Sequence, residues 1–482
     1  MKLNNRLEIE QLKEKKGDFK KIFFFRICGT GMGACASILK EYGFQVEGGD
    51  LAFYPPMSHY LKELEIPLHD LGNVDRAFLQ SYDLIVVGNA IPRNSEQARV
   101  IEECGIAFCS FPAILGALVL SEVNVVGVAG THGKTTTTYL LSQLFTKLGE
   151  KPGHFIGGVI NNTPPALLGA GRYFFIESDE YDSAYFEKIS KFRSYQLNHL
   201  ILTSLEFDHA DIFSDIDQIK NEFTHLIPQV NCSTLISADY SAAQDIHDKF
   251  LAADNGIELK LYGESSEIGP HNIKSSENGT QFTLVIDQQR EQFETNLIGK
   301  HNILNLSSAI LFAYSEQFDL NNIKRSITDL KLVKRRQELR GVYHGSPVID
   351  DFAHHPTAVT LTVEAMISHY PQYRIVTILE PGSATARSDL FQARWVAALG
   401  QSSEVIIIRP QRSTTIKDGT DLDCDKLQLD LKAKQQTCNV VSTLPELQAI
   451  INQCCGDKKL LLFLSNGPCL GLWESDFVNE LW

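Results

Sequence analysis

The sequence predicts an α/β protein built on parallel sheets, and three observations support this class. The chain has 482 residues, which at about 100–200 residues per domain corresponds to roughly three domains. Short runs rich in Val, Ile and Phe alternate with helix-like stretches, a pattern typical of sheets that are buried on both faces. Several runs end at Gly, Asp, Glu or His, and ligands bind at the carboxyl ends of parallel strands. The expected strands are residues 22–27, 84–87, 123–129, 174–176, 200–203, 348–349, 375–379, 405–408 and 460–464.

The composition excludes several other classes. Hydrophobic residues make up 43% of the chain and charged residues 21%, so a disordered chain, a coiled coil and a collagen-like repeat do not fit. A net charge of −15 disfavours nucleic acid as a partner, because an acidic surface repels phosphate. No apolar run reaches the roughly 18 residues of a membrane span, and the first residues lack a signal-peptide core. We expect a cytoplasmic protein without membrane partners, whose 10 cysteines are reduced and mostly buried; a monomer and a weak dimer both stay open.

The grouping of strand–loop–helix units predicts a tail and three domains. The charged tail covers residues 1–20 and is expected to be solvated, with a composition that is compatible with a helix. The first domain is expected over residues 21–118, the central domain over 119–330 and the C-terminal domain over 331–482.

The strongest local signal follows the strand expected at 123–129. It consists of Gly130, Thr131, His132, Gly133, Lys134, Thr135 and Thr136, and it leads into a helix expected over 136–148. The pattern is close to the phosphate-binding loop Gly-x-x-x-x-Gly-Lys-Thr, but shorter when counted from Gly130. Backbone N–H groups at a helix N-terminus cradle phosphates, Lys134 would reach the β and γ phosphates, and Thr135 would bind Mg²⁺. A nucleoside triphosphate and Mg²⁺ are therefore the expected ligands.

Two acidic clusters follow two other strands. Glu177 opens a run of four carboxylates after the strand at 174–176, and Mg²⁺ prefers such oxygen ligands. His209 ends a Glu-Phe-Asp-His sequence after the strand at 200–203. A neutral His is an uncommon Mg²⁺ ligand, so a structural role for His209 stays open. Because the carboxyl ends of parallel strands lie at one edge, both clusters are expected in the same crevice.

A glycine-rich turn follows the first strand. Residues 28–33 read Cys-Gly-Thr-Gly-Met-Gly, and Asp50 follows about 20 residues later. This resembles a dinucleotide-binding unit, with glycines at a diphosphate and an acid at a ribose. A glycine pattern alone is a weak signal, and an ordinary tight turn is the alternative.

Four polar residues farther along the chain complete the candidate set. The amide of Asn302 can read a base edge, and Arg336 can neutralise charge on a transferring phosphoryl group. Asp351 and His354 can order water, a metal ion or phosphate. Taken singly, each of the four is equally compatible with a capping or buried polar role.

These motifs, in this order, resemble the Mur ligases, the ATP-dependent amide-forming enzymes of the bacterial peptidoglycan precursor pathway. The resemblance covers nearly the whole chain after the tail. It implies a Rossmann-like N-terminal domain, a central P-loop ATPase domain and a Rossmann-like C-terminal domain. It also implies ATP and Mg²⁺ as cofactors. The motifs are residues 130–136, 177–182, 206–209, 301–305 and 350–356.

The resemblance further implies the chemistry and its residues. ATP would phosphorylate the carboxylate of UDP-N-acetylmuramate, and an amine would attack the acyl phosphate while the C-terminal domain closes about residues near Lys331. The metal ligands would be Thr135, Glu177 and His209. Asn302 and Arg336 would join residues 130–136 at ATP. The catalytic set would be Lys134, Glu177, His209, Arg336, Asp351 and His354. The UDP-sugar set would be Gly29, Thr30, Met32, Gly33, Asp50 and Asn89.

Within the family, the sequence most resembles the member that joins L-alanyl-γ-D-glutamyl-meso-diaminopimelate to UDP-N-acetylmuramate in peptidoglycan recycling. Residues 54–58, 88–90, 179–192 and 205–213 carry this likeness, and 188–192 form an extra segment before His209. The alternative member adds L-alanine in de novo synthesis. Arg26 stands where a glycine is usual, and Gly382 and Ala384 replace an Arg and an Asn, so the acceptor stays open.

Two hypotheses from other functional classes fit the sequence less well. A nucleotide-dependent switch would need a base-reading Asn-Lys-x-Asp sequence, which the chain lacks. A Rossmann dehydrogenase would rest on residues 29–33 alone and would leave the phosphate loop unexplained.

Overall fold

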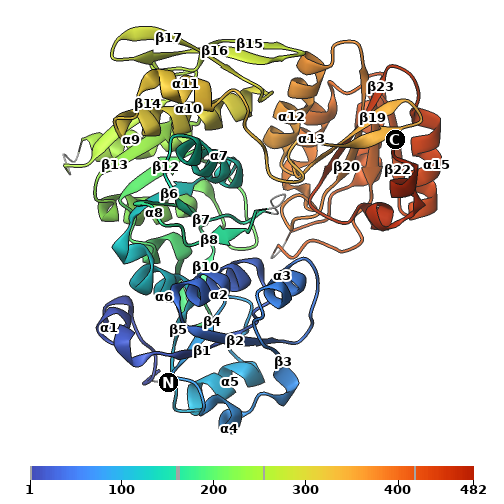
Figure 1. The fold of residues 1–482 in the computed structure, drawn as a ribbon. Helices are drawn as coiled ribbons and strands as arrows, with labels where there is room; N and C mark the ends of the chain where they lie inside the picture. Colours follow the sequence, from blue (N-terminus) through green and yellow to red (C-terminus); the bar gives the residue numbers. More distant parts are fainter. Residues whose placement is uncertain (1–2, 159–162, 253–255, 417–418) are drawn as a thin grey trace. The chain divides into compact units, whose positions relative to one another are not determined.

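The computed structural model describes residues 3–158, 163–252, 256–416 and 419–482. The predicted α/β class is confirmed, because the three larger sheets of these residues are parallel or mainly parallel (Figure 1). The chain divides into two compact units, which are described separately. Unit 1 comprises Met1–Leu205, Ile219–Tyr262 and Leu311–Phe318, and unit 2 comprises Glu206–Gln218, Gly263–Ile310 and Asp319–Trp482. The boundaries expected at residues 20, 118 and 330 stay a prediction.

The N-terminal sheet of unit 1 has the order β3-β2-β1-β4-β5 and is parallel throughout, as in one half of a Rossmann fold. Helices α2 and α6 cover one face, and α4 and α5 cover the other (Figure 1). The strands are β1 (Lys21–Phe25), β2 (Gln45–Asp50), β3 (Leu68–Asp70), β4 (Leu84–Val87) and β5 (Ala107–Ser110). The helices are α1 (Ile9–Glu14), α2 (Thr30–Tyr42), α3 (Met57–Glu63), α4 (Arg76–Leu79), α5 (Glu96–Glu103) and α6 (Phe111–Leu118).

The expected solvated tail is instead docked on this sheet. The backbone of Leu7 and Asn5 pairs with Phe108 of β5 at 2.9 Å, and Leu12 of α1 is fully buried. A helix is present, as the composition allows, but its apolar residues give it a packing face. The prediction of a solvated tail was therefore wrong for residues 3–20.

The central sheet of unit 1 has the order β14-β13-β12-β6-β9-β7-β8, with only the β7–β8 pair antiparallel. The expected strands at 123–129, 174–176 and 200–203 are found within one or two residues, and the helix predicted at 136–148 is α7. The strands are β6 (Asn124–Ala129), β7 (Gly153–Phe155), β8 (Ala166–Leu167), β9 (Tyr173–Glu177), β12 (His199–Leu202), β13 (Ser233–Ser237) and β14 (Glu258–Tyr262). The helices are α7 (Lys134–Lys147), α8 (Ile216–Leu226), which begins in unit 2, and α9 (Ser241–Leu251).

A small hairpin joins the two sheets of unit 1. It consists of β10 (Asp182–Ala184) and β11 (Glu187–Ser190), followed by the 3₁₀ helix η4 (Lys191–Ser194). The backbone of η4 packs so closely on α6 that a Cβ built at Gly116 would overlap the carbonyl oxygen of Ser194. Phe111 of α6 also stacks on Phe155 at 6.4 Å. Lys191, within the extra segment 188–192, lies over the Phe111 ring at 5.6 Å from its centroid, so the end of this segment contacts α6.

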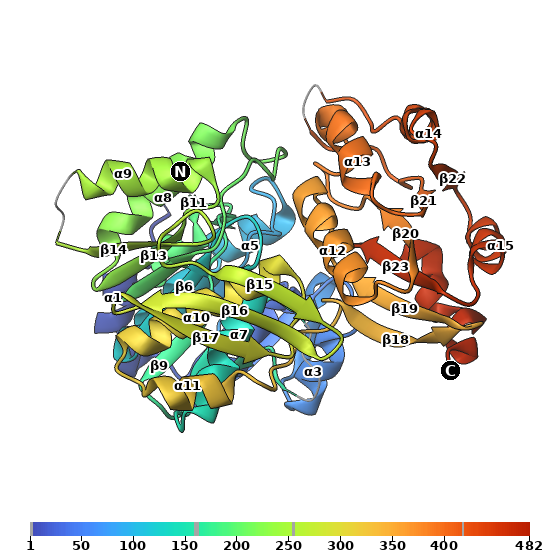
Figure 2. The same ribbon diagram turned by 90° about the horizontal axis from the view of Figure 1, so that it is seen from above.

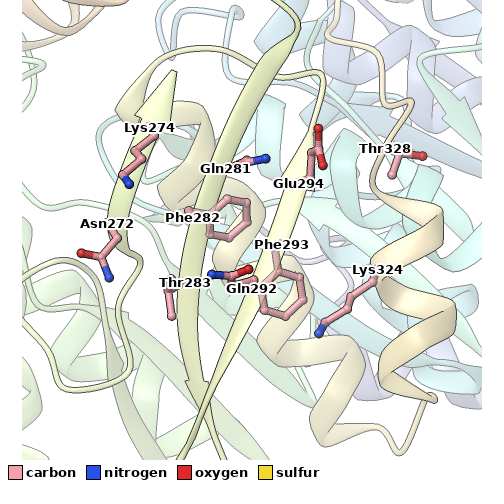
Figure 3. A pocket seen from close by; sticks show the side chains of 10 residues that line it. All are labelled: Asn272, Lys274, Gln281, Phe282, Thr283, Gln292, Phe293, Glu294, Lys324 and Thr328. Atoms are coloured by element: carbon pink, nitrogen blue, oxygen red, sulfur yellow. The ribbon is translucent and has the colours of Figure 1, made fainter. Parts of the chain in front are cut away.

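Unit 2 contains an antiparallel sheet that the sequence analysis missed. Its strands are β15 (His271–Ser276), β16 (Gly279–Ile286) and β17 (Gln289–Thr295), which run side by side in Figure 2. β15 and β17 are mainly polar and exposed, and the short apolar run at the end of β16 was not among the expected strands. A cavity of about 370 Å³ lies beside β16, β17 and α11 (Leu320–Ser326) (Figure 3). None of the predicted site residues lines this cavity.

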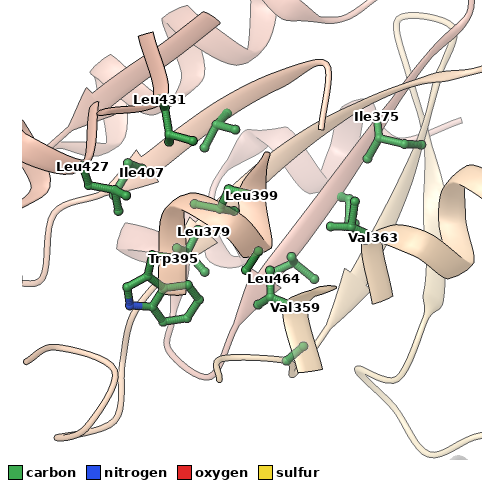
Figure 4. Packing of buried hydrophobic residues seen from close by; sticks show 14 of the residues in the cluster. Val359, Val363, Ile375, Leu379, Trp395, Leu399, Ile407, Leu427, Leu431 and Leu464 are labelled. Atoms are coloured by element: carbon green, nitrogen blue, oxygen red, sulfur yellow. The ribbon is translucent and has the colours of Figure 1, made fainter. Parts of the chain in front are cut away.

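The C-terminal sheet of unit 2 has the order β18-β19-β23-β20-β21-β22, with only β18–β19 antiparallel. Trp395 is fully buried in the cluster that α12, α13 and α14 form on one face (Figure 4); α15 packs on the other. The strands are β18 (Glu338–Tyr343), β19 (Ser346–Asp351), β20 (Arg374–Glu380), β21 (Glu404–Ile408), β22 (Thr437–Val441) and β23 (Lys459–Ser465). The helices are α10 (Lys300–Ser315), which continues into unit 1, α12 (Pro356–His369), α13 (Gln392–Leu399), α14 (Cys424–Ala433) and α15 (Leu444–Cys454).

Two expectations about the whole chain can be compared with the described residues. None of their helices is both long and apolar enough to cross a bilayer. All ten cysteines are free thiols and eight of them are buried, as the sequence predicted.

Candidate active site

The loop that is predicted to bind phosphate lies between β6 and α7 in unit 1. Gly130 has φ 128°, and a Cβ at this position would come within 2.7 Å of the Thr203 hydroxyl oxygen. The backbone N–H of Thr131 donates to Ser204 O at 3.2 Å, and that of His132 donates to Ser204 Oγ at 2.7 Å. Ser204, which follows β12, therefore holds the loop from a neighbouring strand. The sequence analysis missed this residue, because nothing local marks it.

Helix α7 begins at Lys134, so the N–H groups of its first turn lack acceptors within the helix and can bind an anion. Lys134 Nζ donates to Gly130 O at 2.5 Å and lies 3.6 Å from the buried carboxylate of Glu180. Thr135 Oγ1 donates to both carboxylate oxygens of Glu177 at 3.0 Å. Glu177 also accepts the backbone N–H of Gly157 at 2.8 Å. The fold thus brings Lys134, Thr135 and Glu177 together, as predicted from separate motifs.

His209 and His354 lie in unit 2, where they face the same buried carboxylate. Burial by itself would raise the pKa of Asp208, but the facing His209, His354 and His355 lower it below its usual range. His209 adopts φ 55°, and the next residue, Ala210, donates its backbone N–H to Thr385 Oγ1 at 3.1 Å. His354 Nδ1 donates to Phe352 O at 2.8 Å. The predicted metal set is therefore divided between the units, with Thr135 and Glu177 in unit 1 and His209 in unit 2.

Gln337 connects two predicted motifs within unit 2. Its side-chain oxygen accepts the Asn302 amide at 3.1 Å, and its backbone N–H donates to Asp351 Oδ2 at 2.8 Å. Asn302 also donates to Ile298 O at 2.9 Å, so its amide nitrogen is engaged by the chain in this state. Burial raises the pKa of Asp351, and the positive charge of Arg336 opposes that shift. Arg336 itself lies over the Phe352 ring, 5.2 Å from its centroid.

The glycine-rich turn between β1 and α2 is held by Asp50 at the end of β2. The Asp50 carboxylate accepts the backbone N–H of Cys28 at 3.0 Å and that of Leu51 at 2.8 Å. Among the predicted UDP-sugar residues, Met32 and Gly33 are buried below the turn, where Gly33 leaves room for Met57. Thr30 and Asn89 are exposed at the carboxyl ends of their strands, and Gly29 caps α2.

The segment that departs from the family pattern follows β20. A Cβ at Gly382 would overlap Oδ1 of Asn466, so no larger side chain fits there unless Asn466 moves. Arg387 Nη1 donates to Gly382 O at 2.8 Å. The guanidinium of Arg387 thus lies beside residue 382, where the family pattern has an Arg.

Three family models match successive parts of the chain. The model described as "Mur ligase family, catalytic domain" matches residues 21–122, "Mur ligase middle domain" matches 128–313, and "Mur ligase, glutamate ligase domain" matches 335–467. The matches follow the order of the N-terminal, central and C-terminal sheets.

Individual relatives match most of the chain. The UDP-N-acetylmuramate–L-alanyl-γ-D-glutamyl-meso-2,6-diaminoheptandioate ligase of Haemophilus influenzae is 34% identical over 82% of this chain and 86% of its own length. The UDP-N-acetylmuramate–L-alanine ligase of Streptococcus gordonii is 29% identical over 88% of this chain and 91% of its own. The crystal structure of a murein peptide ligase from Psychrobacter arcticus aligns with a TM-score of 0.66 and 28% identity, covering 94% of this chain and 97% of the other.

Proposed function

Because this chain belongs to the Mur ligase family of ATP-dependent amide-bond-forming enzymes, we propose that it joins a murein tripeptide to UDP-N-acetylmuramate. The tripeptide is L-alanyl-γ-D-glutamyl-meso-diaminopimelate, and the product re-enters peptidoglycan synthesis. The observation that carries this proposal is the 34% identity over 397 residues to a ligase named for this reaction. The alanine-adding ligase of Streptococcus gordonii reaches 29%.

A carboxylate cannot acylate an amine directly, because hydroxide is a poor leaving group. In the proposed reaction the muramyl carboxylate attacks the γ-phosphorus of ATP and ADP leaves, which gives an acyl phosphate. The tripeptide amino group then attacks the acyl carbon, loses a proton and expels inorganic phosphate. Two anions must approach each other in the first step, so positive charge is needed between them. Lys134, at the start of α7, is placed to supply it.

Mg²⁺ fits the oxygen donors that lie beside the loop. The Thr135 hydroxyl and the Glu177 carboxylate are 3.0 Å apart, and hard cations take such oxygen ligands next to phosphates. Bound there, Mg²⁺ would neutralise phosphate charge. His209 stays a proposed third ligand. Asp351, His354 and Arg336 are proposed to complete the site from the C-terminal domain, and Asn302 is proposed to contact adenine.

The acceptor can be identified by comparing two amines on one purified sample. We expect ADP release with ATP, UDP-N-acetylmuramate and the tripeptide, with kcat/KM at least roughly 10²-fold above that for L-alanine, because the site must recognise groups that alanine lacks. Omission of UDP-N-acetylmuramate is the control for uncoupled ATP hydrolysis. Equal or faster turnover with L-alanine would overturn the tripeptide assignment and leave the ligase class intact.

The Mg²⁺ proposal has its own test. Chelation by EDTA should abolish ADP release, and added Mg²⁺ should restore it. Glu177→Gln keeps the size of the side chain and removes its charge, so we expect a roughly 10²-fold lower rate and a higher Mg²⁺ requirement. Asp179→Asn is the matched control in the same acidic run, because Asp179 pairs with Lys191 at 3.1 Å. A Glu177→Gln enzyme with wild-type Mg²⁺ dependence would remove Glu177 from the metal site.

The state of the cysteines bears on where the protein works. Ten free thiols, eight of them buried, support a reducing compartment. We propose that the protein acts in the bacterial cytoplasm.

A further inference from the structure

Arg26 has a backbone conformation that a glycine would adopt without strain. It follows β1 directly and has φ 63°, in the left-handed region that side-chain-bearing residues seldom enter. The chain thus has an arginine, where the family usually has a glycine, in a conformation that glycine adopts without strain. Strained residues of this kind persist where their surroundings hold them, and they cluster at ligand sites.

The neighbours of Arg26 fix its guanidinium beside the glycine-rich turn. Nη1 lies 3.1 Å from Asp50 Oδ1, and the side chain of Arg26 is 27% exposed against 5% for Asp50. The other oxygen of Asp50 accepts the backbone N–H of Cys28 at 3.0 Å. The same carboxylate thus holds both the guanidinium and the turn that leads into α2. Nε of Arg26 is buried without a hydrogen-bond partner among the described residues.

The charges around the turn favour an anion. Helix α2 has 13 residues and begins at Thr30 after the cap residue Gly29. The N–H groups of its first turn therefore lack acceptors within the helix and can bind a phosphate. Asp50 offsets the charge of Arg26. Burial raises the pKa of the Cys28 thiol, and the positive charge of Lys62 in α3 opposes that shift, so a second cation acts on the turn. A guanidinium has five N–H donors in a fork that matches phosphate oxygens, and the Asp50 contact uses one nitrogen.

We propose that Arg26 binds the diphosphate of the nucleotide sugar and that Asp50 acts as its positioning partner. This inference rests on the proposed function, which brings a UDP-sugar to the N-terminal domain. In a chain with a net charge of −15, a dianionic ligand needs a local cation, and Arg26 provides one at the turn itself. The left-handed conformation of Arg26 is then the structural cost of placing that charge.

Replacement of Arg26 by the usual glycine separates binding from stability. With UDP as the probe, Arg26→Gly should weaken binding at least roughly tenfold, because a charge-assisted contact to phosphate is lost. The KM for UDP-N-acetylmuramate should rise by the same factor, while kcat and the KM for the tripeptide stay within twofold. Uridine, which has no phosphate, should bind Arg26→Gly and the wild type equally. Arg26→Lys keeps the charge and the Asp50 pair, so it should recover part of the loss.

Gln435→Gly is the matched control for relief of backbone strain. Gln435 has φ 64° and is exposed after α14, so its change to glycine should leave UDP affinity unchanged. Wild-type UDP affinity in Arg26→Gly, or equal weakening of UDP and uridine, would overturn the proposal. If Arg26→Gly does not fold, Arg26→Gln decides, since it removes the charge and wild-type UDP affinity in that variant would equally overturn the proposal. Absence of wild-type turnover with UDP-N-acetylmuramate would instead refute the proposed function, and the UDP titrations would still report on Arg26.

Discussion

Lys134→Ala is expected to lower ADP release by at least roughly 10²–10³-fold, because the charge between ATP and the muramyl carboxylate is lost. The rate is measured with all three substrates at saturation. In the wild type, Lys134 Nζ donates to Gly130 O at 2.5 Å and lies 3.6 Å from the Glu180 carboxylate, which holds it at the loop. Turnover within a few-fold of the wild type would remove Lys134 from the catalytic set.

The same substitution also removes the cation that lies 3.6 Å from the buried Glu180 carboxylate, and removal of one partner of a buried ion pair destabilises a fold. The double variant Lys134→Ala/Glu180→Gln removes both charges, so it should regain stability without regaining activity. Lys147→Ala changes an exposed lysine at the other end of α7 and should leave both properties near wild type. If the double variant recovered turnover, the loss in Lys134→Ala would have come from misfolding.

Gly116→Ala is expected to destabilise unit 1 by about 3 kcal/mol, since the added Cβ would overlap a backbone oxygen that cannot rotate away. Two effects oppose each other here. Alanine is the better helix former by about 1 kcal/mol, so helix propensity alone predicts stabilisation of α6. The clash with Ser194 is larger, and Tm should fall by roughly 6–12 °C for a cooperative unit of 150–250 residues.

Gly17→Ala provides the control for a glycine without such a contact. Gly17 lies in the 3₁₀ helix η1 (Lys16–Asp18), and a Cβ there would meet nothing within 4 Å, so its effect should stay within about 0.5 kcal/mol. Thermal unfolding measures both variants. A Gly116→Ala protein with unchanged or higher Tm would mean that η4 can move off α6.

Some contacts of the candidate site could be predicted from the sequence, and others could not. The strand, the glycines and the helix of residues 124–147 are consecutive, so the phosphate loop could be predicted from local sequence. The contact between Thr135 and Glu177 followed from a general rule, because the carboxyl ends of neighbouring parallel strands lie at one edge. Ser204 was missed and Gln337, next to Arg336, was given no role, since each acts on residues that are distant in sequence.

The amino-acid sequence determined the α/β class, the positions of most buried strands and the glycine-containing loop between β6 and α7. These features are encoded in apolar periodicity, in glycines at positive φ and in residues close together in the chain. Tertiary structure alone decided that α1 docks on β5, that η4 packs on Gly116 and that Asp50 holds Arg26 at the turn. Each of these contacts joins residues more than 20 positions apart, where packing and charge compensation depend on the folded arrangement and leave no local pattern.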